Sequence, residues 1–222
     1  MGNKIKRITD ILAEFIDKSG LRWETKLKEL LTLKTYRHAD IKRLLTGDIK
    51  GLLSKFIASN ISENDPFSRL VSLIKNVQLL NHFGFEQDGK IFIPLPLPLA
   101  DGYFTVGQLL IQLDQYKNKE PRKKTRENGL FRISFLLELS NLGPVRADLA
   151  VRDKQITGRF LTIKEETKYV IEKNLPSFIE AFKKRGFSIF HLECHIREPK
   201  QVGDSLIREI IRKESCNISL IA

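Results

Sequence analysis

The fold is decided by residues 130–152, LFRISFLLELSNLGPVRADLAVR, where two alternating runs flank a glycine-proline pair at Gly143-Pro144. In each run every second residue is apolar, which is the period of two expected for half-buried strands. Glycine followed by proline supplies the geometry of a turn. We therefore predict two strands, over residues 131–139 and 145–152, joined at this turn.

The residues after the second strand change from a strand period to a helix period. Ile156 and Phe160 continue the sheet after a turn at Asp153-Lys154. Thr162 and Glu165 have the spacing of a capping box, which predicts the start of a helix. Its buried face consists of apolar residues with helical spacing, namely Tyr169, Val170, Ile171, Leu175, Phe178, Ile179 and Phe182.

This helix and the strand after it complete a ββαβ block that ends at Ile196. Pro176 predicts a kink near Asn174 or a division into two short helices, because proline disrupts a helix interior. Gly186 is expected to end the helix. The inner face of the next strand is predicted at Phe190, Leu192, Cys194 and Ile196, and its outer face at His191, Glu193 and His195.

The first third of the chain shows helical spacing of apolar residues, which we interpret as core packing rather than a ligand site. Asp65 is a capping residue, Pro66 suits the first turn, and the helix that they open is expected to end at Gly84. Further apolar stripes precede it, at Ile5, Ile8, Leu12, Phe15 and Ile16; Leu27, Leu30 and Leu31; Ile41, Leu44 and Leu45; and Ile49, Leu52, Leu53, Phe56 and Ile57.

Residues 88–113 connect the helical first third of the chain to the strand-rich block. Asp88-Gly89 is typical of a tight hairpin turn, and Gly107 predicts a β-bulge, because the apolar residues change parity there. The Pro-Leu repeat over residues 94–99 predicts an edge strand or a polyproline-like arm, with its leucines inward, since proline cannot donate to a central ladder. The alternative for this repeat is a ligand for a proline-reading module.

These patterns predict an α+β fold in which an N-terminal helical region precedes a small mixed α/β domain with a ββαβ core. We place the helical region at residues 1–82, the mixed domain at 83–198 and a C-terminal extension at 199–222. The extension is expected to hold a short helix over Leu206, Ile207, Ile210 and Ile211, followed by a final strand over residues 217–221.

The composition narrows the function classes. The formal net charge of +11 favours acidic protein surfaces, nucleic acid or anionic lipid as partners. Cys194 and Cys216 lack the spacing of a disulfide framework or a zinc site, so a reducing compartment is expected. The sequence has no apolar run of about 20 residues and no signal peptide, so we expect a cytoplasmic protein without membrane insertion.

Residues 116–128 are almost wholly polar and predict a long loop. Its functional interpretation is an electrostatic finger for an acidic partner or a phosphate backbone, and the alternative is a solvated, disordered loop. The basic residues expected to contact a partner are Lys117, Lys119, Arg122, Lys123, Lys124 and Arg126.

An enzyme is not indicated, and no cofactor or metal is expected. The sequence has no phosphate-binding loop, dinucleotide turn, serine elbow or zinc-ligand spacing. The nearest thing to a metal or acid-base cluster is the outer-face set His191, Glu193 and His195, which lacks further ligands.

The block resembles the C-terminal domain of bacterial flagellar hook-length control proteins. The residues that carry the resemblance, which we interpret mainly as fold determinants, are Leu142, Gly143, Pro144, Val145, Glu166, Thr167, Leu175, Pro176 and Gly186. The resemblance implies a small non-catalytic α+β module that acts on the cytoplasmic domain of the flagellar export gate and switches secretion from hook to filament subunits. It also implies that the chain is cytoplasmic, or is exported through the flagellar apparatus.

Two departures from the family bear on this interpretation. Arg146 replaces the acidic residue usual at that position, which adds a basic residue beside the turn and to the expected contact set. The long Pro/Ser/Gln-rich ruler region of such proteins is not seen here, so we expect a stand-alone switch, regulator or scaffold. The alternative function is a basic nucleic-acid-binding protein, which would use the 116–128 loop and the lysine- and arginine-rich helical segment over residues 25–43.

Overall fold

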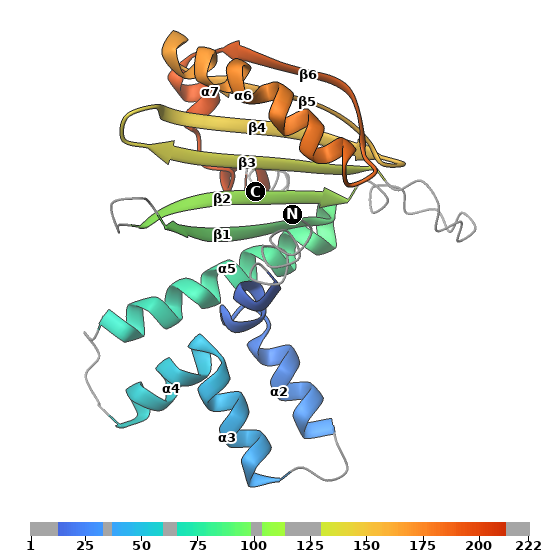
Figure 1. The fold of residues 1–222 in the computed structure, drawn as a ribbon. Coiled ribbons are helices and arrows are strands. Elements are labelled where there is room, and N and C mark those ends of the chain that lie inside the picture. The colour runs from blue at the N-terminus through green and yellow to red at the C-terminus, as the bar shows by residue number, and fades with distance from the viewer. Residues whose placement is uncertain (1–12, 33–36, 60–65, 99–103, 114–129, 212–222) are drawn as a thin grey trace, which may run out of the picture. The chain divides into compact units, whose positions relative to one another are not determined.

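The computed structural model describes residues 13–32, 37–59, 66–98, 104–113 and 130–211 (Figure 1). It confirms an α+β protein with helices in the first third and a sheet thereafter. The chain divides into two compact units, residues 1–79 and 80–222. Within the described ranges, no helix is long and apolar enough to cross a membrane.

The first unit is helical. Residues 13–18 form a helical turn, and α2 (Trp23–Thr32), α3 (His38–Gly47), α4 (Ile49–Ser59) and α5 (Pro66–Asp88) follow. Its small apolar core consists of Leu53, Val71 and Ile74, with Ile57 packed against them. The predicted helix start at Pro66 is confirmed. The stripe over Ile5, Ile8 and Leu12 lies outside the described residues.

The predicted end of α5 at Gly84 and the hairpin at Asp88-Gly89 are wrong. Gly84 is buried inside the helix, and a β-carbon there would lie 3.1 Å from the carbonyl oxygen of Lys90 and 3.2 Å from Ile210. The glycine therefore serves close packing rather than termination. Gly89, with φ of +64°, ends the helix instead and leads directly into the first strand.

The second unit contains a six-stranded sheet with the strands in sequence order. The strands are β1 (Lys90–Pro98), β2 (Phe104–Leu113), β3 (Phe131–Leu139), β4 (Gly143–Arg152), β5 (Gln155–Thr162) and β6 (Ser188–Ile196). Neighbours are antiparallel except β5 and β6, which are parallel and joined by α6 (Glu165–Lys183). The two strands predicted around Gly143-Pro144, and the ββαβ order that follows, are confirmed.

The Pro-Leu repeat forms the edge strand β1, which confirms one of the two structures predicted for it. Alternate residues of a strand direct their N–H groups to the same edge, so prolines at every second position remove no bond to β2. On the same outer edge, the Asn81 side chain of α5 accepts from the Phe92 N–H at 2.6 Å and donates to the Phe92 carbonyl at 2.8 Å.

The predicted bulge at Gly107 is also wrong, because β1 and β2 pair in continuous register through Leu95 and Gly107. A β-carbon at Gly107 would lie 3.1 Å from both Leu97 and Phe135, so the glycine allows these side chains to pack closely. The irregularity of the sheet lies instead between Ile156 and Thr157, where the pairing with β6 skips Phe190. Phe190 is 81% exposed, which corrects its assignment to the inner face.

Helix α6 is one element that continues past Pro176 rather than two short helices. The predicted capping box is wrong, because Thr162 lies in β5 and the helix begins at Glu165 after Lys164. Gly186 follows the helix end as predicted, with φ of +81°. The N–H of Phe187 bonds the Phe182 carbonyl and that of Gly186 bonds the Lys183 carbonyl, which is the Schellman pattern.

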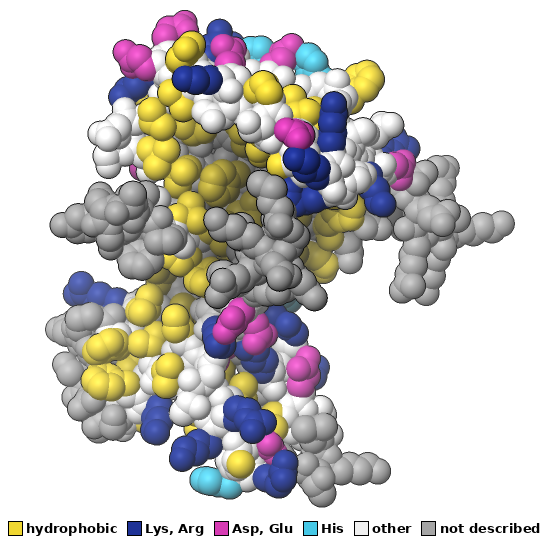
Figure 2. Space-filling model, viewed as in Figure 1, with side chains coloured by type: hydrophobic (Ala, Val, Ile, Leu, Met, Phe, Trp, Pro, Cys, Tyr) yellow, Lys and Arg dark blue, Asp and Glu magenta, His cyan; other side chains and the backbone are white. Residues whose placement is uncertain are grey.

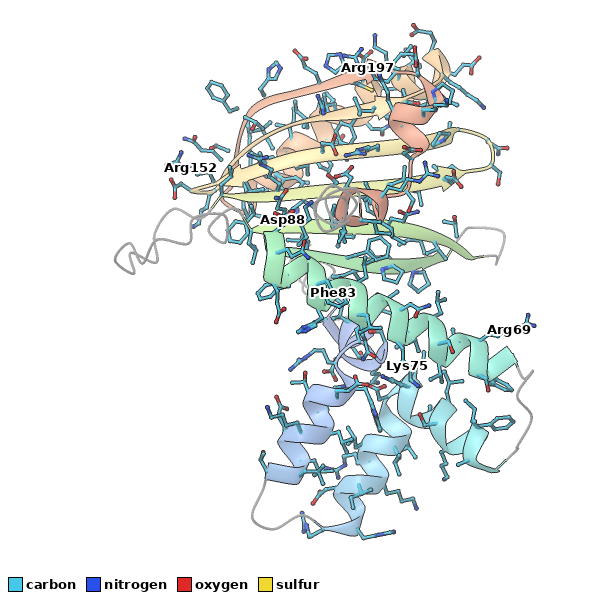
Figure 3. The ribbon with its side chains drawn as sticks, turned by 180° about the vertical axis from the view of Figure 1, so that it is seen from behind. Arg69, Lys75, Phe83, Asp88, Arg152 and Arg197 are labelled. Carbon is cyan, nitrogen blue, oxygen red and sulfur yellow. The ribbon has the colours of Figure 1, made fainter. Side chains whose placement is uncertain are left out.

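Helix α6 covers one face of the sheet, where Phe178 contacts Phe160 with ring centroids 5.8 Å apart. The short helices α7 (Pro199–Gly203) and α8 (Arg208–Ile211) lie on the opposite face, which Figure 3 shows from the front. This tail is anchored by apolar side chains that are at most 4% exposed, namely Val202, Leu206 and Ile210.

Candidate interaction surface

The sheet face that bears the tail also bears an open charged trough of about 570 Å³. Residues opposite each other in paired strands share a face, so alternate positions of β3 to β6 contribute to it. Figure 3 looks onto this face. Its main polar lining residues are Gln112, Arg132, Ser134, Arg146, Asp148, Thr157, Arg159, His191, Glu193, His195 and Glu209.

Asp148 in β4 is the centre of the hydrogen-bond network in this trough. Its carboxylate accepts from the Ser134 hydroxyl at 2.8 Å and from Arg146 Nε at 2.8 Å. Arg159 of β5 lies 3.4 Å from its other oxygen. Three strands therefore share one carboxylate, which fixes the side chains that point from this part of the sheet.

Arg146, predicted to contact a partner, lies in the trough with 14% of its side chain exposed. Its guanidinium also pairs with Glu209 of α8 at 2.6 Å, which ties the tail to β4. Burial lowers the pKa of Arg146, but the bonds to Asp148 and Glu209 outweigh it and raise the pKa overall. The positive charge at this position is therefore already offset by two carboxylates.

The predicted outer-face set on β6 is confirmed as one cluster. His191 Nε2 lies 2.7 Å from Glu193, and His195 Nε2 lies 2.9 Å from its other carboxylate oxygen. The three side chains are 37–58% exposed. Within the part of the chain that the structure describes, no group of three or more His, Cys, Asp or Glu residues is arranged to hold a metal.

The six basic residues from Lys117 to Arg126 lie outside the described residues, so their contact role stays a prediction. Sequence reasoning missed the central role of Asp148 and the partnership of Glu209 with Arg146. The role of Asp148 could have been predicted from strand parity, because Ser134, Asp148 and Arg159 all lie at polar positions of neighbouring strands. The second depends on how the tail folds back, for which the sequence carries no local signal.

Some of the residues that carry the family resemblance lie at or against the β3–β4 turn. Gly143 has φ of +74°, a conformation that favours glycine. The buried Thr167 hydroxyl of α6 donates to the Leu142 carbonyl at 2.7 Å, and a β-carbon added at Gly203 of α7 would lie 3.8 Å from Pro144. This turn therefore binds the start of α6 and the tail to the sheet. The other residues of the set occupy further positions, with Val145 and Leu175 half-buried and Glu166, Pro176 and Gly186 exposed.

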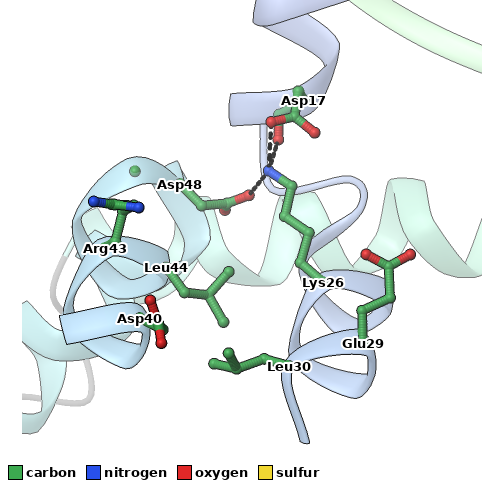
Figure 4. A pocket seen from close by; sticks show the side chains of 9 residues that line it. Asp17, Lys26, Glu29, Leu30, Asp40, Arg43, Leu44 and Asp48 are labelled. Carbon is green, nitrogen blue, oxygen red and sulfur yellow. Dashed lines mark hydrogen bonds and ion pairs between the residues drawn. The ribbon is translucent and has the colours of Figure 1, made fainter. Parts of the chain in front are cut away.

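A second cleft, of about 460 Å³, lies within the first unit between α2 and α3 (Figure 4). Lys26 Nζ reaches Asp17 at 3.0 Å and Asp48 at 3.2 Å across it. Asp48 is 1% exposed and also accepts from the N–H of Lys50 at 2.9 Å, which caps the start of α4. These ion pairs hold the helices together, so we interpret this cleft as structural.

The sheet, the crossing helix and the tail define the second unit as a small α+β domain. Residues 119–203, which lie wholly within it, match the family model described as flagellar hook-length control protein FliK. This part of the chain is therefore similar to the flagellar hook-length control family, as the sequence resemblance predicted. Searches of curated proteins and of solved structures found no match.

Proposed function

We propose that this chain is a non-enzymatic protein-interaction module of flagellar type III export, which helps to switch secretion from hook to filament subunits. The observation that carries the proposal is the family match, which covers the β3–β4 turn, α6 and α7. The chain acts in the cytoplasm, or passes through the flagellar apparatus, and needs no cofactor.

The proposed partner is the cytoplasmic domain of the flagellar export gate. Attraction to an acidic surface of that domain is supported by the net charge of +11 and by the six basic residues from Lys117 to Arg126. The charged trough, which belongs to the same unit, offers paired carboxylates and guanidinium groups, which favour polar, oriented contacts over apolar burial.

The test is binding of the purified full chain to the purified cytoplasmic domain of the export gate from the same organism, measured by biolayer interferometry. Replacing Arg122, Lys123 and Lys124 by serine is expected to weaken binding at least about tenfold, mainly through a slower association rate. The matched control replaces three exposed basic residues of the first unit, Lys28, Lys42 and Arg43, and is expected to leave binding unchanged.

The same variants separate this function from nucleic-acid binding. If the unmodified chain shows no affinity for the gate domain but retards a DNA or RNA duplex with a steep salt dependence, the nucleic-acid alternative replaces the proposal. If both triple variants weaken gate binding equally, the attraction is general and the assigned contact segment is wrong.

A further inference from the structure

The first unit carries an exposed apolar surface that its own small core does not use, and we name it the α4–α5 patch. On α4 the exposed residues are spaced i, i+3 and i+7, so they lie along one flank of the helix. On α5 they are spaced i, i+3 and i+6, so each is a surface neighbour of the next. All six side chains are between 39% and 58% exposed. They are Ile49, Leu52 and Phe56 on α4, and Phe67, Leu70 and Leu73 on α5.

The two stripes are joined at one end. The rings of Phe56 and Phe67 meet with centroids 4.6 Å apart, which connects the end of α4 to the start of α5. Figure 2 shows hydrophobic side chains gathered over α4 and the first turns of α5, with basic side chains around them. A contiguous exposed apolar surface rimmed by polar residues is typical of an interaction site.

The exposed charged residues on the two helices that carry this patch are basic, and we call them its rim. The described residues of α4 and of α5 up to residue 79 contain exposed Lys55, Arg69 and Lys75 and not one Asp or Glu. The nearest acidic residues in sequence, Glu63 and Asp65, lie in the 60–65 segment outside the described residues. An apolar centre with a positive rim is complementary to a surface that has an apolar centre and a negative rim.

We propose that the α4–α5 patch docks an acidic amphipathic helix of a protein partner. The α4 stripe spans seven residues, which is about 10 Å along the helix axis. That length matches two turns of a docked helix, which would offer apolar side chains at i, i+3 or i+4, and i+7. Two stripes on adjacent helices provide a surface on which a third helix can rest.

Two other occupants fit less well. A second copy would bring the same basic rim against itself, and like charges in juxtaposition oppose association. An anionic membrane is complementary in charge to the basic rim. However, each of the two stripes is only about two turns long, whereas helices that lie in a bilayer interface bury a long apolar face. This proposal concerns the first unit and does not depend on the flagellar role assigned to the second.

The experiment uses the immobilised full chain as bait for a display library of 16-residue helical peptides with randomised surface positions. We expect enriched peptides to carry apolar residues at i, i+3 or i+4, and i+7, together with a net negative charge. The best peptide is then synthesised, and its dissociation constant is measured by fluorescence anisotropy.

Three variants locate the site. Leu52→Ser combined with Leu70→Ser is expected to weaken peptide binding at least about tenfold, because it removes two apolar contacts. Leu79→Ser, which changes a 55% exposed leucine elsewhere on α5, is the matched control and should bind normally. Reversing the rim with Lys55→Glu, Arg69→Glu and Lys75→Glu alters only exposed side chains, so folding is preserved, and it should abolish binding of the acidic peptide.

Several results would overturn the proposal. Enrichment no better than on an empty support, or enrichment of basic peptides, would show that the patch does not select an acidic helix. A dimer in light scattering that the double serine variant converts to a monomer would assign the patch to a second copy. Binding to phosphatidylglycerol vesicles that the same variant abolishes, without any selected peptide, would assign it to a membrane surface.

Discussion

The two units bury different kinds of side chain. In the first unit, Asp48 and Lys50 are at most 4% exposed, and they sit among few fully buried apolar residues. In the second unit, the least exposed residues include Ile156, Val202 and Leu206, and the central charges Arg146 and Asp148 keep 14–19% of their side-chain surface exposed. Buried charged side chains therefore link the helices of the first unit, whereas apolar contact dominates the second unit, in which Lys90 is also buried.

The polar network of the first unit connects three of its helices. Lys50 of α4 pairs with Glu24 of α2 and bonds Gln78 of α5 at 2.6 Å. Gln78 also donates to the carbonyl of Gly20 at 2.7 Å. Because a buried charge is costly without its partner, each member constrains the positions of the others.

The largest effect should come from Asp48→Ala. The substitution removes the cap of α4 and a fully buried ion partner of Lys26, so we expect a loss of about 4 kcal/mol in the free energy of unfolding of the first unit. Urea unfolding followed by fluorescence of Trp23, the single tryptophan, measures this unit. Asp48→Asn keeps the cap but not the charge and should lose about half as much; equal losses in the two variants would show that the cap contributes nothing.

The next effect tests the apolar second unit. Leu206→Ala removes a fully buried side chain and should cost about 3 kcal/mol. Burial protects the Cys194 thiol and raises its pKa, so thiol labelling in urea, in a Cys216→Ser background, reports unfolding of this unit. The Trp23 transition should stay where it is, and a joint shift of both transitions would mean that the two units unfold as one.

Much of the second unit could be predicted from sequence, because strand parity is a local property. The alternation around Gly143-Pro144 located two strands, and proline at every second position of the repeat marked an edge. The errors arose at glycine and aromatic residues whose role depends on packing or pairing with residues far away in the chain. Gly84 admits Ile210, Gly107 admits Phe135, and Phe190 is skipped by the pairing of β5 with β6.

The sites were less predictable than the fold. The cluster at His191, Glu193 and His195 followed from alternation along one strand. The pairing of Arg146 with Glu209 joins residues far apart in the chain, and the buried pair Asp48 and Lys50 sits in a helical pattern that looks like an ordinary solvated face. Side-chain burial of this kind is set by tertiary packing, which periodicity does not encode.

A smaller effect compares two buried threonine hydroxyls of the second unit, one with and one without a hydrogen-bond partner among the described residues. Thr167→Val removes the hydroxyl that bonds Leu142 and should cost about 1.5 kcal/mol. Thr162 is also fully buried, but its hydroxyl has no hydrogen-bond partner among the described residues, so Thr162→Val should stabilise by about 1 kcal/mol. The measurement is again Cys194 labelling, and destabilisation by both changes would show that Thr162 has a partner.

The smallest effect is the pH dependence of the first unit. Burial raises the pKa of Glu24, but the bonds from Lys50 and Gln78 outweigh it, so the folded-state pKa is lowered below its ordinary value of 4.5. A lowered folded-state pKa contributes stability that is fully present above the unfolded pKa and is lost as pH falls through the folded one. Titrating the Trp23 transition from pH 6 to pH 3 should therefore show a decline in the free energy of unfolding that Glu24→Gln makes shallower.

Glu180 on α6 also has a lowered pKa, chiefly from its bond to Lys184, but it is exposed. The Glu24 side chain is 60% exposed, but its partner Lys50 is only 5% exposed, whereas Glu180 and Lys184 are both 65% exposed. Because salt screens exposed pairs more than buried ones, 0.5 M salt should weaken the effect of Glu180→Gln on the Cys194 transition more than that of Glu24→Gln on the Trp23 transition. Erasure of both would mean that the Lys50 network is open to solvent, and the contrast between the two units would then rest on apolar burial alone.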